Sequence, residues 1–205
     1  MLDGRSIIYS SADIAYNSYK LKDHNFKPEI FFSRCNIFVE GPCDEYAIAA
    51  ISDKLGGIFD KYSIQIVSVG GKDILESYVD IIKAFSISHV AMTDYDYLCD
   101  SNTRKPTNRK TTTDFVILPQ RLEEVLYIFD SSVNVMKNFD FDHPCHTNKD
   151  DQPKSVDSNS AYKIVSEAIS RNVQSVRSSK LGDIVTKALE KSGVESLDWN
   201  SQLIL

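Results

Sequence analysis

Asn36-Ile-Phe-Val-Glu-Gly-Pro-Cys-Asp44 is a short apolar run that ends in two carboxylates. The apolar residues 37–39 predict a buried strand, which the Gly-Pro pair ends. The proline suits the first position of a helix, which we predict to extend to about residue 55. Glu40 then stands at the exit of the strand and Asp44 in the first turn of the helix. Both acids are therefore expected at the same edge of a sheet.

A second apolar strand runs into acids at residues 90–97, Val-Ala-Met-Thr-Asp-Tyr-Asp-Tyr. Asp94 and Asp96 are two residues apart, so in an extended chain they point the same way. Four carboxylates at one edge repel one another unless a cation neutralises them, and such hard oxygen ligands suit Mg²⁺ or Mn²⁺ rather than zinc. The alternative is that Asp44 only favours a helix N-terminus and that the two later acids are loop residues.

The composition is that of an ordinary soluble globular protein. The 205 residues are 42% hydrophobic and 25% charged, enough for one domain with a core and a small appendage. We expect no membrane span and no export signal, and therefore a cytoplasmic protein. The four cysteines show no C-x-x-C pairing, so reduced thiols are expected. A net charge of −6 argues against broad affinity for nucleic acid but does not exclude a nuclease with bound cations.

The order of elements predicts an α/β fold with a mostly parallel central sheet flanked by helices. Residues 63–69 predict a second strand, residues 74–85 a helix with apolar side chains at helical spacing, and residues 88–93 a third strand. A fourth strand is predicted at 114–118, followed by a helix that opens at Pro119. Alternating strands and helices imply right-handed crossovers and a functional edge at the carboxyl ends of the strands.

Gly70, Gly71 and Lys72 follow the second strand at that same edge. Their backbone N–H groups and one ammonium are predicted to bind a phosphate, although a Gly-Gly turn before a helix is also a common tight connection. The polar run 100–113 contains four basic residues and is interpreted as a loop beside the acids, which either holds a phosphate backbone or is only solvated. No P-loop and no G-x-G-x-x-G motif occurs.

Two glutamates begin the helix after the fourth strand. Glu123 and Glu124 fall in its first turns, where a carboxylate either reaches a metal or complements the helix dipole. We favour a metal ligand, and Glu123 over Glu124.

The motifs together resemble a known family. Val39-Glu-Gly-Pro-Cys-Asp44, Val69-Gly-Gly-Lys72, Thr93-Asp-Tyr-Asp96 and Arg121-Leu-Glu-Glu-Val-Leu126, in this order, resemble the TOPRIM domain, in the version found in the overcoming-lysogenisation-defect (OLD) nucleases. The resemblance covers roughly residues 31–126. It implies two cations, Mg²⁺ or Mn²⁺, and hydrolysis of DNA phosphodiester bonds.

The resemblance also implies how ligands divide between the two ions. Glu40 and Asp44 would bind one cation, Asp94 would lie between the two, and Asp96 and Glu123 would face the second. Glu40, Asp94 and Asp96 would then be catalytic as well.

Family members carry a late lysine before a helix that steadies charge on the scissile phosphate. Lys180, which precedes residues 181–189, is the matching candidate, although a solvated lysine at a helix start is an equal alternative. His143, Cys145 and His146 do not have the spacing of a usual structural zinc site.

The organisation that follows has three parts. Residues 1–35 are a lead-in or the remnant of a junction, 36–130 the TOPRIM core, and 131–205 an irregular insertion with C-terminal helices that complete the nuclease domain. OLD proteins join this domain to an ATPase, so a separate or fused ATPase is an expected partner beside DNA.

The function predicted is a metal-dependent endonuclease that acts on DNA. The alternatives are primase-like nucleotidyl transfer and a non-catalytic nucleotide- or phosphate-binding module in a larger assembly.

Overall fold

The computed structural model describes residues 27–99, 112–118, 121–135 and 156–203. A four-stranded sheet lies at its centre, made of β1 (Cys35–Val39), β2 (Ile64–Ser68), β3 (His89–Thr93) and β4 (Phe115–Ile117). The strand order is β2-β1-β3-β4, and all the pairings are parallel. The mostly parallel sheet expected from the sequence is therefore confirmed.

Helices connect and follow the strands. Between β1 and β4 the described chain forms α2 (Pro42–Lys54), α3 (Ile58–Tyr62), α4 (Lys72–Ala84) and the 3₁₀ turn η2 (Tyr95–Leu98). A 3₁₀ turn η1 (Pro28–Phe31) precedes the sheet, and α5 (Leu122–Phe129), α6 (Ser158–Arg177), α7 (Lys180–Lys191) and α8 (Trp199–Gln202) follow it.

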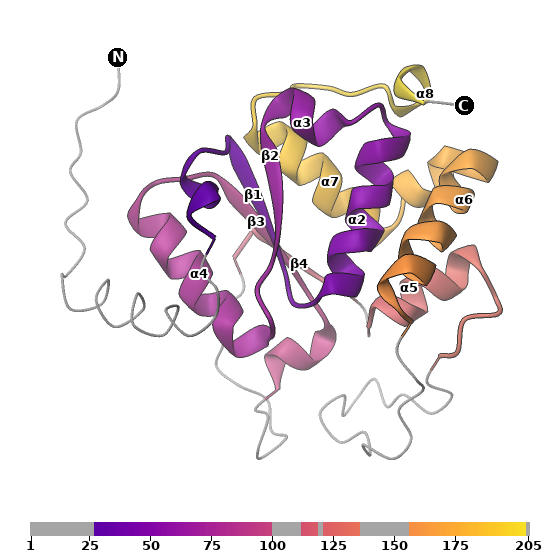
Figure 1. Cartoon of the computed structure of the whole chain (residues 1–205), viewed down its shortest axis with the longest axis horizontal. Helices are drawn as coiled ribbons and strands as arrows, with labels where there is room; N and C mark the ends of the chain where they lie inside the picture. Colours follow the sequence, from indigo (N-terminus) through magenta and orange to yellow (C-terminus); the bar gives the residue numbers. More distant parts are fainter. Residues whose placement is uncertain (1–26, 100–111, 119–120, 136–155, 204–205) are drawn as a thin grey trace.

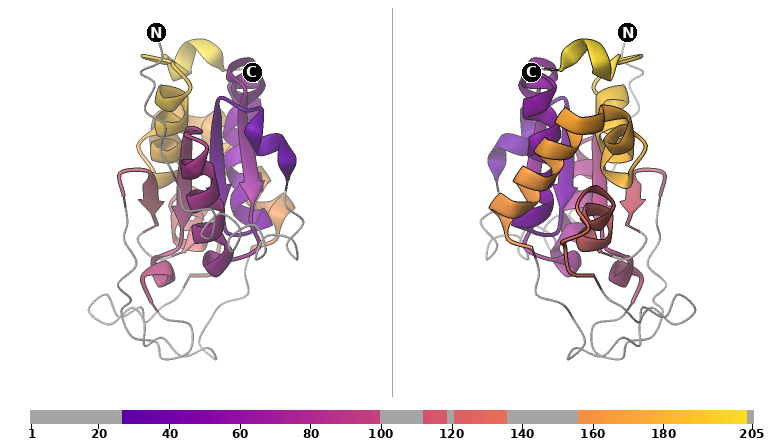
Figure 2. Two further views of the ribbon diagram at one scale, coloured as in Figure 1. Left: turned by 90° about the vertical axis from the view of Figure 1, so that its left-hand side faces the viewer. Right: turned by 90° about the vertical axis from the view of Figure 1, so that its right-hand side faces the viewer.

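The connections create a switch point between β1 and β3. The chain leaves β1 through α2 and α3 to reach β2 on one side, then returns through α4 to β3 on the other side of β1. Right-handed crossovers in opposite directions put α2 and α4 on opposite faces of the sheet, as Figures 1 and 2 show. In open parallel sheets, ligands bind beyond the carboxyl ends of the strands at such a point. Here β1 and β3 end side by side, and each is followed by an acid.

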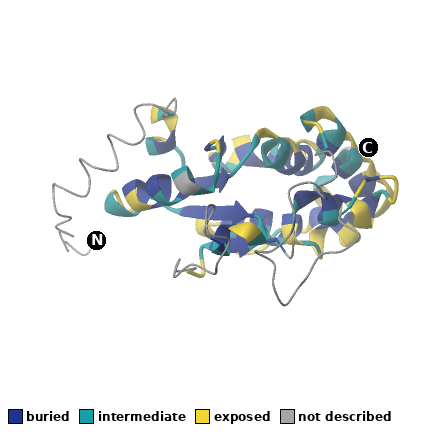
Figure 3. Cartoon of the chain, turned by 90° about the horizontal axis from the view of Figure 1, so that it is seen from below, coloured by how far each residue is buried: buried dark blue, intermediate teal, exposed yellow. Residues whose placement is uncertain are grey.

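The two faces of the sheet carry cores of unequal size. The strands appear as a buried layer between helices in Figure 3. Ile37 and Val39 of β1 pack on the larger core with α2, α5, α6 and α7, whereas Phe38 points to the smaller core with α4. All five residues of β1 and of β3 are buried, which explains why these strands are near-continuous apolar runs.

The C-terminal helices complete the larger core. α6 packs along α2, and its backbone breaks at Asn172, where φ is −160° and ψ is 92°. Gly182 in α7 lies so close to the end of α6 that a Cβ at this position would be 2.1 Å from the carbonyl oxygen of Arg177. A glycine is thus required where the two helices meet.

Two sequence expectations are wrong in detail. The helix after β4 begins at Leu122 rather than at Pro119, because Arg121 is its extended N-cap. Cys99 is disulfide-bonded, although reduced thiols were expected, and its partner lies outside the described residues. A single pair of distant cysteines has no spacing signature, so the sequence could not indicate it. Cys35 and Cys43 are free.

Several expectations lie outside the described residues. These concern most of the lead-in, the basic loop at 100–111, and the group of His143, Cys145 and His146. No helix in the described part of the chain is long and apolar enough to cross a membrane.

Candidate metal centre

Glu40 lies at the switch point, one residue beyond β1. The β1–β3 register brings it beside Thr93, whose hydroxyl donates to the Glu40 carboxylate. The Asp94 N–H lies 3.3 Å from Glu40 Oε1 as a second donor. Burial raises the pKa of Glu40 to about 7; the bond from Thr93 opposes this rise, while the charges of Asp96 and Asp44 add to it. Glu40 is thus a partly buried acid among other acids.

Asp44 occupies the first turn of α2, as expected. Its Oδ2 accepts the Gly41 N–H at 3.0 Å, so it does complement the helix start. Burial nevertheless raises its pKa to about 6, because the bond from Gly41 only partly compensates and the charge of Glu123 adds to the rise. The helix-capping interpretation therefore describes a real contact without accounting for the neighbouring negative charge.

Asp94 is the most crowded of the acids. Burial raises its pKa well above the usual value, and the charges of Asp44, Glu40 and Asp96 add to that effect. Arg121 is the positive charge that opposes it. Each neighbouring carboxylate disfavours ionisation of the others, and the charge of Arg121 opposes this effect only in part.

Asp96 is placed differently from the sequence expectation. An extended chain was predicted, but residues 95–98 form the 3₁₀ turn η2, so Asp94 and Asp96 do not alternate as in a strand. The side chain of Asp96 is 61% exposed, and its Oδ2 pairs with Lys72 Nζ at 3.2 Å. Short 3₁₀ turns carry weak sequence signals, and this one is contacted by a lysine 24 positions away in the sequence.

The two glutamates of α5 are separated by the structure. Glu124 accepts the Arg121 N–H at 3.0 Å and caps the helix. Glu123 is 6% exposed, and its charge acts on Asp44. Glu123 thus belongs to the acidic group, whereas Glu124 serves the helix start.

Arg121 is a residue of the site that the sequence analysis left unassigned. Its Nη2 lies 3.4 Å from Glu123 Oε1, and its charge favours ionisation of Asp94. Its Nη1 is buried and has no hydrogen-bond partner among the described residues. The available signal was its position two residues before Glu123, but an arginine at a helix start is also common on surfaces.

The arrangement fits a hard divalent cation by its donors. Glu40, Asp44, Asp94, Asp96 and Glu123 supply carboxylate oxygens from the ends of two strands and two helices. In the described part of the chain no three acidic, histidine or cysteine side chains already form a metal-binding group. Several of these carboxylates instead accept hydrogen bonds from donor groups of the protein. Cation binding would exchange those donors for the ion and relieve the mutual repulsion.

The other predicted residues lie in different surroundings. Gly70 and Gly71 have positive φ values of 86° and 135°, and the Gly70 N–H donates to Glu40 O at 3.0 Å, so the turn adjoins the acids. Lys180 pairs with Asp183 at 3.1 Å, and about half of each side chain is exposed. None of the charges that shift the pKa of Asp94 comes from Lys180.

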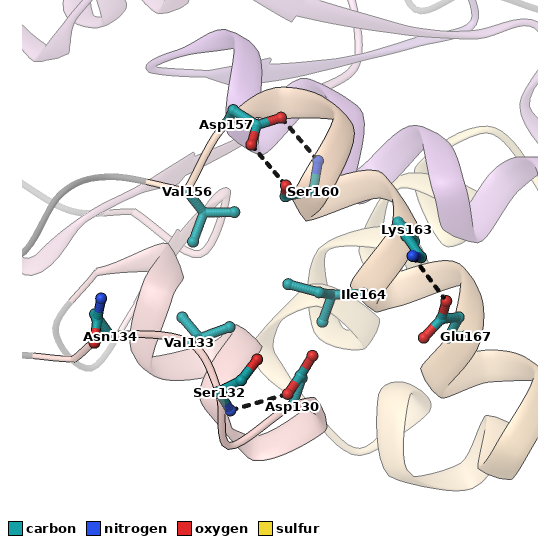
Figure 4. Close-up of a pocket in the computed structure, with 10 residues that line it drawn as sticks. All are labelled: Asp130, Ser132, Val133, Asn134, Val156, Asp157, Ser160, Lys163, Ile164 and Glu167. Carbon is teal, nitrogen blue, oxygen red and sulfur yellow. Dashed lines mark hydrogen bonds and ion pairs between the residues drawn. The ribbon is translucent and has the colours of Figure 1, made fainter.

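A separate cavity of about 440 Å³ lies between the turn after α5 and the start of α6. In Figure 4, Val133 and Ile164 face its interior from opposite walls, and Asp130 and Asp157 stand at its edge. Both aspartates already accept hydrogen bonds from nearby serines. None of the five acids of the candidate metal centre lines this cavity.

Comparison with known families identifies the core. Residues 31–96 match the family described as "Overcoming lysogenization defect protein-like, TOPRIM domain". These residues are an OLD-like TOPRIM domain. The resemblance inferred from the sequence is therefore confirmed, and the match includes Glu40, Asp44, Asp94 and Asp96.

One solved structure agrees with this assignment at the level of the fold. The C-terminal region of the Xanthomonas campestris pv. campestris OLD protein covers 82% of this chain and 98% of its own, at 18% identity and a TM-score of 0.50. The corresponding region of the Burkholderia pseudomallei OLD protein covers 78% of this chain and 97% of its own, at 16% identity and a TM-score of 0.42. No curated protein matches the chain.

Proposed function

We propose that this OLD-like TOPRIM domain is a divalent-metal-dependent endonuclease that hydrolyses DNA phosphodiester bonds. One observation carries the proposal: acids that follow adjacent parallel strands meet at the switch point and are held there with raised pKa values. A fold gains nothing from such repulsion unless a cation is bound for part of the working cycle. TOPRIM domains generally bind divalent metals.

The acids take the roles that the family implies. Glu40 and Asp44 would hold one ion, Asp94 would contact both, and Asp96 and Glu123 would hold the second. When bound, two such ions, Mg²⁺ or Mn²⁺, supply an activated water and stabilise the attacking and leaving oxygens. Glu40 is kept in orientation by the Thr93 hydroxyl, which restricts its carboxylate beside Asp94.

Positive charge for the substrate would come from residues around the acids. Arg121 is the described cation whose charge reaches Asp94, and its side chain is 24% exposed, so it is accessible to a phosphate oxygen. The Gly70–Gly71 turn lies near the same edge, but the Gly70 N–H already donates to Glu40 O, so the proposed backbone donor for the phosphate is Gly71. Lys180 remains the proposed late lysine, which would have to exchange Asp183 for the phosphate.

The direct test is nicking of supercoiled plasmid by the purified chain. Cleavage is expected in Mg²⁺ or Mn²⁺ and should stop when a chelator is added. DNA binding without turnover in either metal would contradict the nuclease and favour the non-catalytic binding module. Extension of a primer with nucleoside triphosphates would instead favour nucleotidyl transfer.

We also propose that the domain works with an ATPase, fused or separate. The related solved structures are C-terminal regions of OLD proteins. The net charge of −6 gives this chain little non-specific attraction to DNA, so a partner would supply part of that binding. Purification from the native host should recover an ATPase with the chain. Recovery of a lone, fully active 23.1 kDa species with tight DNA binding would contradict this.

A further inference from the structure

Lys72 is saturated by contacts within the protein. Its Nζ lies 2.8 Å from Asp96 O, 3.2 Å from Asp96 Oδ2 and 3.3 Å from Cys99 O. A lysine ammonium has three N–H donors, so these three acceptors match its full capacity. The side chain is only 13% exposed. A phosphate oxygen would have to displace one of these partners.

The backbone places Lys72 where these acceptors converge. Gly70 and Gly71 adopt positive φ values that other residues rarely adopt, and they turn the chain so that α4 starts at Lys72. The lysine side chain then reaches the carbonyl oxygen of Asp96 within η2 and that of Cys99 just after it. Lys72 therefore ties the start of α4 to the turn after β3.

The contacts of Lys72 restrain Asp96, the acid that lies on that turn. Lys72 contacts the Oδ2 of Asp96 as well as its backbone oxygen, so both the turn and the carboxylate are restrained. Tyr97 N bonds Asp94 O at 3.1 Å and Cys99 N bonds Asp96 O at 2.9 Å, which links the same turn to Asp94. The contact of Lys72 with the carboxylate involves its Oδ2.

We propose that Lys72 is a positioning residue, which fixes the Tyr95–Leu98 turn and thereby sets Asp96 relative to Asp94, rather than a residue that binds the phosphate. The inference rests on the proposed function for the role of Asp96 as a metal ligand. It predicts that Lys72 contributes to metal affinity and turnover but not to DNA binding. A phosphate ligand would show the opposite pattern.

The test compares Lys72→Met with wild type and with Lys163→Met, which removes the same charge from a 76% exposed lysine on α6. Calorimetric titration of the protein with Mn²⁺ alone should give about 10-fold weaker binding for Lys72→Met, because groups that orient ligands typically affect affinity by that much. With saturating Mn²⁺, kcat should fall while KM for DNA stays unchanged. Lys163→Met should match wild type throughout.

DNA binding at several salt concentrations separates the two roles. Positioning predicts the same salt dependence for Lys72→Met and wild type, whereas loss of a phosphate contact would reduce the slope of log K against log salt by about one. A reduced slope with unchanged Mn²⁺ affinity would overturn the inference.

Hydrogen exchange in the metal-free protein keeps the inference separate from the nuclease assignment. Lys72→Met should accelerate exchange of the Tyr97 and Cys99 amides, whose bonds close the turn. Unchanged exchange would overturn the inference even if the wild type cleaves DNA. A wild type that binds Mn²⁺ without cleaving would contradict the proposed function, while the exchange and affinity results would still decide the role of Lys72.

If Lys72→Met does not fold, Lys72→Arg is measured instead. The same directions are expected, because the broader planar guanidinium cannot reproduce the geometry of the ammonium.

Discussion

Acidic side chains at the two ends of the parallel sheet have pKa values shifted in opposite directions. At the carboxyl ends of β1 and β3, Glu40 and Asp94 lie among other acids, and their pKa values are raised. At the amino ends of β3 and β4, Asp114 accepts a hydrogen bond from Lys191 and lies 3.8 Å from His89. Burial alone would raise the pKa of Asp114, but the bond and charge of Lys191, with a smaller contribution from His89, hold it below its usual range.

This difference distinguishes a stabilising cluster from the proposed binding site. The amino end contains its own counter-charges and needs nothing from outside. At the carboxyl end, Arg121 acts on Asp94 and Glu123, and Lys72 pairs with Asp96, which gives two described cations for five neighbouring carboxylates. Charge that the protein leaves uncompensated at a topological switch point is best explained by an external cation.

The largest effect is expected from Asp94→Asn. The substitution removes a carboxylate between the two proposed ions, so cleavage should fall on the order of 10³-fold. Thermal stability of the metal-free protein should hold or rise, because one member of a repelling group is neutralised. Asp114→Asn is the matched control at the other end: it should keep full activity and lower the melting temperature. Full nicking activity in Asp94→Asn would break the comparison.

The stability of the folded chain should depend on pH through the raised pKa of Glu40 at the carboxyl end of the sheet. The pKa of Glu40 is about 7 in the folded chain against a usual 4.5, so the folded state binds this proton more tightly. Its contribution is therefore complete below about pH 4 and is lost as pH rises through 7, by roughly 3 kcal/mol. Urea unfolding of metal-free wild type, measured against Glu40→Gln, should show this loss between about pH 4 and 8.

The matched variant is needed because His89 acts in the opposite direction. Burial lowers the pKa of His89, so its contribution to stability grows as pH rises through its usual value of 6.5. The difference between wild type and Glu40→Gln cancels this effect. A difference that does not depend on pH would contradict the assigned pKa of Glu40.

Two candidate cations at the substrate can be ranked by substitution. Arg121→Met should reduce kcat by about 10- to 100-fold, because a charge near Asp94 and Glu123 is lost from beside the reacting phosphate. Lys180→Met should have a smaller effect, since that lysine is half exposed and paired with Asp183. Single-turnover rates at saturating DNA measure both. A larger loss for Lys180→Met would show that α7 supplies the functional cation.

The smallest effect concerns the compensated end. Lys191→Met keeps the aliphatic stem but leaves Asp114 without its main partner, so the free energy of unfolding should fall by about 1–2 kcal/mol. Metal-dependent cleavage should not change. Urea unfolding and nicking assays on the same preparation measure both quantities, with Lys163→Met as a surface control. Lost cleavage in a stable Lys191→Met protein would contradict the division of roles.

The sequence predicted most of the sheet and the acids but few of their contacts. Residues 37–39 and 90–93 are apolar because both faces of their strands are buried, and such runs are legible without a structure. The bonds of Lys72 to η2 and of Thr93 to Glu40 join residues 24 and 53 positions apart, and no local pattern encodes them. The same holds for Arg121, whose importance depends on what lies around it.

Local irregularities of the backbone could not be predicted from the periodicity of apolar residues either. The turn at Tyr95–Leu98 replaces a predicted extension, and a lysine from another element contacts the carbonyl oxygens of Asp96 and Cys99. α6 belongs to the C-terminal helices that were expected, but the break in its backbone at Asn172 was not predicted.

The central claim is that the carboxyl end of the sheet binds divalent cations. A crystal structure of the protein soaked in Mn²⁺, with anomalous scattering to locate the metal, tests it most directly. The account predicts anomalous peaks about 2.0–2.3 Å from carboxylate oxygens of Glu40 and Asp94, with Glu40 released from Thr93. Ordered crystals with no peak at these acids, or with manganese only at the Asp130 and Asp157 cavity, would contradict it.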